Sequence, residues 1–216
     1  MNDKVKGSRP YNSERRAAKA AENRSAILQA ARELISDNGY RGTSIAQIAK
    51  AAGVAVDTVY ASVGRKPQLM RELVETALSG SDSTVPGPER DYVTAMRAVG
   101  SAREKLGIYA KAVTRIQVRL VPVFAALREA AVTDPDCAAL WSEISARRAN
   151  NMRMLAADLR TTGQLRDDMD DGEVADAIWS MNGPEYWLML VAERGWSPDQ
   201  YRAWLVEVWC RTLLAS

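Results

Sequence analysis

The sequence has 216 residues, 47% of them hydrophobic, which is enough for one medium domain or for a small domain joined to a larger one. It has no histidine and only two cysteines, Cys137 and Cys210, so Ser-His and Cys-His nucleophile pairs and the common zinc patterns are excluded. The net charge of +2 is uneven, because residues 1–80 hold 13 Lys and Arg against 8 Asp and Glu, whereas residues 81–216 hold 16 against 19. A basic first third on a mildly acidic remainder is typical of a nucleic-acid-binding head joined to a body with another role.

Residues 1–23 are expected to form a basic, flexible arm. Lys4, Lys6, Arg9, Arg15 and Arg16 would then reach the minor groove of DNA or its phosphates, although a solvated tail without a function explains the same charges. The N-terminus lacks the apolar segment of a signal peptide, and no apolar run is long enough to span a bilayer. We therefore expect a cytoplasmic protein with no membrane partner.

Residues 24–80 are predicted to form a small helical domain. Apolar residues recur at helical spacing between positions 24 and 37, and Asn38 with Gly39 provides a stop. Ser44 and Gln47 have the spacing of a capping box at the start of a second helix, which Gly53 ends. A third short helix is expected over 56–62 and a fourth over 67–79. Two short helices joined by a glycine-containing turn form a helix-turn-helix.

Residues 81–216 are predicted to form a second, larger helical domain after a Gly, Ser and Pro-rich break at 80–88. Ser101 with Glu104 should start a helix that Pro122 interrupts or kinks. Further helices are expected over 135–159, 173–180, 184–193 and 198–214. No strand pattern is evident, so the fold class is all-α.

The segment "AILQAARELISDNGYRGTSIAQIAKAAGVAVDTVYASVGRKPQLMRELV" resembles the N-terminal DNA-binding domain of TetR-type (tetracycline-repressor-like) transcriptional regulators. The resemblance covers residues 24–78, and its ordered parts are a Gly-Tyr turn, Thr-Ser opening a helix, Ile-Ala followed by Ala-Gly-Val, a Thr and a Tyr, and a Lys before a Leu. The family implies a homodimer with a three-helix DNA-binding head and a helical body for dimerisation and small-molecule binding. It also implies a palindromic operator, from which a ligand releases the protein.

The resemblance and the pattern together give the candidate DNA-binding residues. Thr43 and Ser44 lie at a helix N-terminus, where hydroxyl and backbone N–H groups can meet a phosphate, although both residues are equally suited to capping alone. Lys66 matches a phosphate-binding lysine of the family, and Arg65 adds a second cation. The complete candidate set is Thr43, Ser44, Asp57, Thr58, Tyr60, Ala61, Arg65 and Lys66.

Asp57 departs from the family pattern, which commonly has Gly at this position, and Ala55 replaces the usual serine cap. One interpretation is structural, with Asp57 replacing the missing cap or interacting with the helix dipole. The alternative is that its carboxylate accepts a hydrogen bond from a cytosine N4 amine in the major groove.

In the body, the family layout assigns residues to a pocket and to a dimer interface, although core packing explains the same aromatic residues. The pocket candidates are Tyr109, Val113, Phe124, Trp141, Met152, Leu155, Trp179 and Tyr186. The interface candidates are Trp187, Trp204, Leu205, Val208 and Leu213.

The sequence is therefore interpreted as a homodimeric repressor, without catalytic activity, cofactor or metal, whose partners are double-stranded operator DNA and an unidentified small-molecule effector. A constitutive or architectural DNA-binding dimer is the first alternative. An all-α carboxylate-dependent enzyme is the second, with Asp167, Asp168, Asp170 and Asp171 as an acidic cluster, which is better explained as a solvated turn and helix start.

Overall fold

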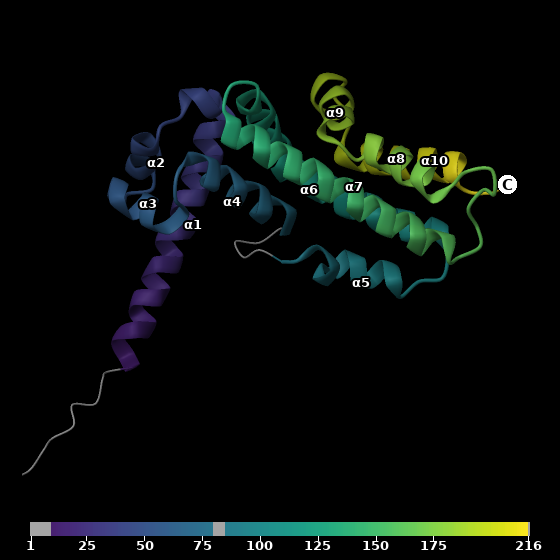
Figure 1. Cartoon of the computed structure of the whole chain (residues 1–216), viewed down its shortest axis with the longest axis horizontal. Helices are drawn as coiled ribbons and strands as arrows, with labels where there is room; N and C mark the ends of the chain where they lie inside the picture. Colours follow the sequence, from purple (N-terminus) through teal and green to yellow (C-terminus); the bar gives the residue numbers. More distant parts are fainter. Residues whose placement is uncertain (1–9, 80–84, 216) are drawn as a thin grey trace, which may run out of the picture. The chain divides into compact units, whose positions relative to one another are not determined.

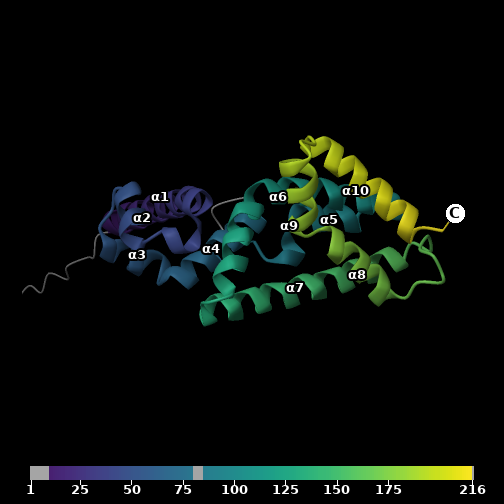
Figure 2. The same cartoon turned by 90° about the horizontal axis from the view of Figure 1, so that it is seen from above.

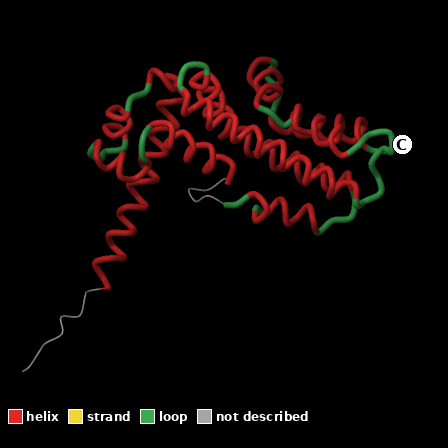
Figure 3. The backbone as a smooth tube through the Cα atoms, viewed as in Figure 1, coloured by secondary structure: helices red, strands yellow, loops and turns green. Residues whose placement is uncertain are grey.

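The computed structural model describes residues 10–79 and 85–215. Within these ranges the elements are helices (Figure 3). The only extended pairing in the same ranges is an isolated bridge between Leu165 and Leu214. The prediction of an all-α fold is confirmed. The chain divides into two compact units, Met1–Glu72 and Leu73–Ser216. We call them unit 1 and unit 2.

Unit 1 begins with the helix α1 (Pro10–Gly42), which starts well before the expected position 24. The described part of the predicted flexible arm is therefore helical, and Arg15 and Arg16 are exposed on this helix. The stretch is rich in Ala, Arg, Lys and Glu, which are strong helix formers, and Lys19 pairs with Glu22 one turn away. Lys4, Lys6 and Arg9 lie outside the described residues.

Three shorter helices follow: α2 (Ile45–Ala51), α3 (Val56–Val63) and α4 (Lys66–Ser79) (Figure 1). The first half of α4 belongs to unit 1 and its second half, from Leu73 on, to unit 2. The helical course of α1 is broken at Gly39, whose φ of 71° lies in the left-handed region that glycine adopts without strain. The break falls at the predicted stop. The core of the unit consists of apolar side chains from all four helices, namely Ile27, Leu28, Ala31, Ile35, Ile48, Ala49, Val59, Val63, Leu69 and Met70.

Unit 2 is built around α6 (Ala102–Ala131), which packs against α5 (Asp91–Arg97), α7 (Pro135–Arg160), α9 (Pro184–Trp187) and α10 (Pro198–Leu213). Figures 1 and 2 both show α6 and α7 as long neighbouring helices. A 3-10 turn, η1 (Gly87–Glu89), precedes α5. The helix α8 (Asp171–Met181) packs on α7, and a π-helical turn, η2 (Leu188–Glu193), continues α9.

Of the two outcomes expected at Pro122, an interruption or a kink, the interruption is wrong, because α6 continues through this residue to Ala131. Val121, Val123 and Phe124 are all buried, so packing holds the helix together on both sides of the proline. The carbonyl of Val118, which a proline four residues later leaves without its helical donor, belongs to a residue that is 57% exposed.

The acidic cluster of unit 2 has structural partners. Asp168 accepts two hydrogen bonds from Arg166, Asp171 accepts one from Arg160, and Asp170 caps the N-terminus of α8. The Arg166 guanidinium holds the pKa of the Asp168 carboxyl below its usual value. The interpretation of this segment as a turn and helix start agrees with these contacts.

In the part of the chain that the structure describes, none of the helices combines the length and the apolar character needed to cross a bilayer.

Candidate nucleic-acid interface and small-molecule cavity

The helices α2 and α3 of unit 1 form a helix-turn-helix. Ile48 and Ala49 of α2 and Val59 and Val63 of α3 are buried, and the two helices pack against each other. Asp57, Tyr60 and Ala61 are exposed, and their spacing of three and four residues places them on one face of α3. Thr58 is partly buried. This is the arrangement in which a recognition helix can enter the major groove with one polar face free.

Thr43 and Ser44 have different local roles at the start of α2. The Thr43 side chain is buried, and its hydroxyl donates to the backbone carbonyls of Leu34 at 3.0 Å and Gly39 at 2.9 Å. It therefore ties the end of α1 to α2. Ser44 is exposed, and it forms the predicted capping box with Gln47. Of the two residues, Ser44 is the one accessible to a phosphate.

Lys66 is directed toward the interior of unit 1. Its Nζ donates to the backbone carbonyl of Tyr40 and lies 4.0 Å from the centroid of the Tyr40 ring. Both contacts stabilise the segment that follows the break at Gly39. The neighbouring Arg65 side chain is exposed instead. Of these two residues, Lys66 therefore stabilises the fold of unit 1, and Arg65 carries its charge at the surface.

The N-terminus of α3 has no side-chain cap, as Ala55 implies. Asp57 is exposed in the first turn, and its carboxylate makes no hydrogen bond to any described residue. The proposed capping by Asp57 is therefore not seen in the structure. Its interaction with the helix dipole remains, because an anion in the first turn of a helix is favoured without a hydrogen bond.

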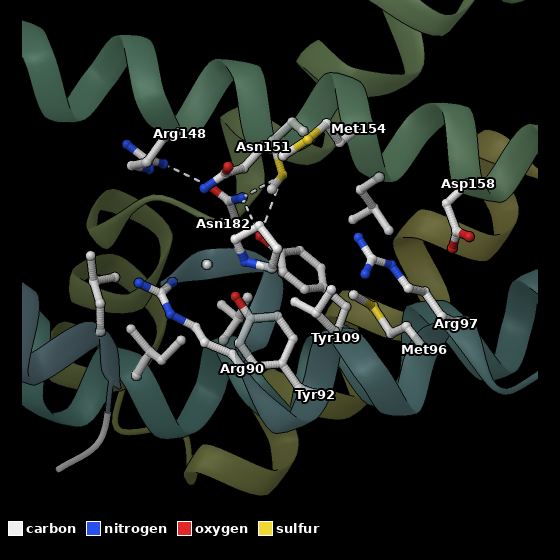
Figure 4. A pocket seen from close by; sticks show the side chains of 18 of the residues that line it. Arg90, Tyr92, Met96, Arg97, Tyr109, Arg148, Asn151, Met154, Asp158 and Asn182 are labelled. Carbon is white, nitrogen blue, oxygen red and sulfur yellow. Dashed lines mark hydrogen bonds between the residues drawn. The ribbon is translucent and has the colours of Figure 1, made fainter. Parts of the chain in front are cut away.

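Unit 2 contains a cavity of about 170 Å³ between α5, α6 and α7. Its lining is mainly apolar, with Val93 and Met96 from α5, Val113 and Ile116 from α6, and Leu155 from α7. Leu78, near the end of α4, also lines it. Figure 4 shows the polar groups that interrupt this surface, among them Arg90, Arg97, Arg148 and Asn182. A mostly apolar cavity with a few directed polar groups is typical of a small-molecule site.

Asn182, at the end of α8, connects three side chains that line the cavity (Figure 4). Its Oδ1 accepts from Nη2 of Arg148 at 2.6 Å, and its Nδ2 donates to Oη of Tyr109 at 2.8 Å and to Sδ of Met152 at 3.0 Å. Burial lowers the pKa of Arg148 and raises that of Tyr109 above its usual value. The Tyr109 hydroxyl therefore stays protonated.

Comparisons with known proteins agree with this geometry. Residues 27–73, which include the whole helix-turn-helix, match the family model of bacterial regulatory proteins, tetR family. This segment of the chain is thus similar to the DNA-binding domain of the tetR family. A search of the curated proteins found no match.

Solved structures of low sequence identity share the TetR fold along nearly the whole chain. The fatty acid degradation regulator FadR from Bacillus halodurans is 19% identical, with a TM-score of 0.68 over 85% of this chain and 94% of that one. A transcriptional regulator from Saccharomonospora viridis in complex with choline is 20% identical, with a TM-score of 0.67 over 89% and 98%. NalD, the secondary repressor of the MexAB-OprM multidrug efflux pump in Pseudomonas aeruginosa, is 21% identical, with a TM-score of 0.66 over 92% and 98%. The chain thus has the fold of these regulators, and its helix-turn-helix lies in the segment that matches the tetR family model.

The predicted pocket residues fall into two groups in the structure. Four of them, Tyr109, Val113, Met152 and Leu155, lie in the cavity lining. The other four do not. Phe124 packs on Trp141 with ring centroids 5.0 Å apart, and Tyr186 packs on Trp204 at 5.4 Å. Trp179 lies behind the lining, where the Arg148 guanidinium carbon is 5.1 Å from its ring centroid.

The predicted dimer-interface residues also fall into two groups. Trp187, Leu205 and Leu213 are buried in the core of unit 2, which leaves them no surface to offer a partner. They form the inward face of α9 and α10, and periodicity alone does not distinguish a core face from an interface face. Trp204 and Val208 are partly exposed on α10, so the interface hypothesis now depends on these two residues.

The cavity residues that come from η1 and α5 were not predicted from the sequence. Arg90 lies at the N-terminus of α5, and Tyr92, Met96 and Arg97 belong to the helix itself. The apolar residues of "DYVTAMR" have helical spacing, with an aspartate in the first turn, and this is the signal that would have identified α5. No comparable signal exists for Arg148 and Asn182, because their contact joins positions 34 residues apart.

Proposed function

We propose that this protein is a homodimeric repressor that binds a palindromic operator through α2 and α3, and that a small molecule in the cavity of unit 2 releases it. The observation that carries the proposal is the course of α4. This helix begins at Lys66, directly after the helix-turn-helix, and at its other end contributes Leu78 to the cavity lining. One continuous helix thus connects the two sites, so a ligand that displaces Leu78 would also bias the position of α4.

The exposed face of α3 supports the DNA-binding part of the proposal. Tyr60 is 48% exposed, and Asp57 and Ala61 lie on the same face of α3. Arg65, just after α3, supplies a cation, and Ser44 lies at the N-terminus of α2. Base edges would be read by α3, and phosphates would be bound by Arg65 and the start of α2.

The cavity also favours a ligand-responsive regulator over a constitutive or architectural DNA binder. A body that served only for dimerisation would be expected to have a fully packed core, whereas unit 2 keeps about 170 Å³ open beside Tyr109 and Arg148.

The experiment is a selection of binding sites from random duplex DNA with the full-length protein, followed by measurement of affinity at several salt concentrations. We expect enrichment of a palindrome with half-sites about 34 Å apart, and an affinity that falls steeply with salt. Light scattering should give the mass of two chains for the free protein and the mass of two chains plus the duplex for its DNA complex. A selection that enriches no palindrome, together with binding that does not depend on salt, would overturn the proposal.

A further inference from the structure

The polar lining of the cavity in unit 2 is predominantly cationic. Arg90, Arg97 and Arg148 line it, against a single carboxylate, Asp158. Asp158 already accepts a 2.8 Å hydrogen bond from Nζ of Lys105, a residue that is only 3% exposed. The charge of Asp158 is therefore matched, and the three arginines leave an excess of positive charge.

Arg148 has no carboxylate within ion-pair distance among the described residues. Nη2 donates to Asn182 at 2.6 Å and to the carbonyl of Trp179 at 3.4 Å, whereas Nε and Nη1 make no hydrogen bond to a described residue. The guanidinium also lies 5.1 Å from the ring of Trp179 and 5.9 Å from that of Phe124. Glu185, which contributes to the electrostatics of Arg148, is hydrogen-bonded to Arg128 at 2.7 Å. A half-buried guanidinium without a counter-ion is costly, and an anion in the cavity would remove that cost.

A second observation points independently to a polar ligand atom at the same end of the cavity. Gln117 is 2% exposed, and its Nε2 donates to the carbonyls of Asn182 at 2.8 Å and Gly183 at 3.0 Å. Its Oε1 is buried without any hydrogen-bond partner. Gln117 and Arg148 both line the cavity, and both contact Asn182, Gln117 at the backbone carbonyl and Arg148 at the side-chain Oδ1. Buried acceptors without donors are rare in folded proteins, and a hydroxyl or amine of a ligand would satisfy this one.

The size of the cavity limits the apolar part of the ligand. A volume of about 170 Å³ is close to the roughly 150 Å³ of an engineered cavity that binds benzene. The apolar side chains of Val113, Met152 and Leu155 offer such a body an apolar surface.

We propose that the cavity binds a small organic acid, with its carboxylate at Arg148, a hydrogen-bond donor on an adjacent atom at Gln117, and an apolar body of about one ring. This inference rests on the proposed function, since it names the chemical class of the effector. A cationic ligand would meet three arginines and no unpaired carboxylate in the lining.

The test is calorimetric titration of the full-length protein with ligands that differ only in the head group. Two bodies are used, a ring and a chain: phenylacetate, phenylacetamide and phenethylamine, then octanoate, octanamide and octylamine. We expect the acid to bind best on at least one body, at least about tenfold more tightly than its amide, and the amine not to bind. Mandelate, which adds a hydroxyl beside the carboxylate of phenylacetate, should bind more tightly than phenylacetate. Failure of mandelate to do so overturns the role of Gln117.

Matched variants assign the acid preference to one residue. Arg148→Gln should remove the preference for acid over amide while leaving amide binding in place. Arg153→Gln changes an exposed arginine on the same helix outside the cavity lining and should leave the preference intact. The proposal is overturned if neither acid binds at about 1 mM, if an amide or amine binds as well as its acid, or if Arg148→Gln keeps the preference.

The same ligands, added to the complex with the selected operator, separate this inference from the proposed function. Release of the operator by an amide or an amine would overturn the acid class and leave the ligand-released repressor standing. Binding of an acid through Arg148 without any change in operator affinity would leave the acid site standing and overturn its role as an effector site.

Discussion

Asp57 is a charged residue on the exposed face of the recognition helix whose carboxylate makes no hydrogen bond to the described part of the protein. Because Asp57 caps no backbone group, only the dipole interaction contributes to stability. We expect Asp57→Asn to lower the free energy of unfolding by less than about 1 kcal/mol. If Asp57 reads cytosine, the same variant should relax the preference at one base pair of each half-site by about 1–3 kcal/mol.

Urea unfolding and binding to single-base variants of the selected operator measure the two effects. Asp37→Asn, which changes an exposed acid on α1, is the control and should alter neither quantity. A large loss of stability without a change in base preference would show that Asp57 is structural.

Lys66 and Arg65 are adjacent in sequence and differ in environment. Lys66→Met removes a charged hydrogen bond to the Tyr40 carbonyl and the cation from the Tyr40 ring, so the free energy of unfolding should fall by about 1–2 kcal/mol. Arg65→Met should change it by less than about 0.5 kcal/mol, because the side chain is exposed. In operator binding the order should reverse. Arg65→Met should reduce the slope of log affinity against log salt by about 1 for each phosphate that Arg65 neutralises, and an unchanged slope would contradict a phosphate role for Arg65.

At the scale of single helices, α6 contains an interior proline that costs stability. Pro122 removes a backbone donor from a helix that otherwise continues to Ala131. Pro122→Ala restores the hydrogen bond to the carbonyl of Val118, so we expect the free energy of unfolding to rise by about 1–3 kcal/mol. Urea unfolding monitored by circular dichroism measures this change. A loss of stability would show that the proline ring makes a packing contribution larger than its backbone cost.

The helix starts that carry a capping side chain are the ones that the sequence predicts best, because a cap is a local signal. Ser44 with Gln47, Asp134 before Pro135, and Ser197 before Pro198 all cap helices in the structure. Each depends on side chains within three residues of the backbone groups that they satisfy.

The missed elements depend on longer-range packing. The helix α5 has only seven residues and lies between two loops, so its stability comes from packing on α6 rather than from its own sequence. The inward placement of Leu205 and Leu213 has the same origin. The helices α6 and α8 pack on α10, and this packing decides which apolar face of α10 is buried within the subunit. The position of Arg148 in the cavity lining depends on Asn182, which the sequence places only at a helix break.

At the scale of the whole molecule, each of the two units has a capping box that can be removed by the same serine substitution, and the stability of each unit can be followed separately. A capping box starts α2 in unit 1, formed by Ser44 and Gln47, and another starts α10 in unit 2, formed by Ser197 and Gln200. Removing either serine hydroxyl should cost about 0.5–2 kcal/mol in its own unit. All six tryptophans of the sequence lie in unit 2, so tryptophan fluorescence reports the unfolding of unit 2 alone, whereas circular dichroism reports both units.

We therefore expect Ser197→Ala to shift the urea midpoint measured by tryptophan fluorescence. Ser44→Ala should leave this midpoint unchanged and shift only the part of the circular dichroism transition that comes from unit 1. Operator affinity should fall in Ser44→Ala, because α2 positions the recognition helix, and ligand binding by unit 2 should not change. If Ser44→Ala moves the fluorescence midpoint as far as Ser197→Ala does, the two units unfold as one cooperative body through α4. In that case the folding of unit 1 would be coupled to the folding of unit 2, as the repressor proposal requires. A ligand that binds unit 2 would then raise the free energy of unfolding of both units together.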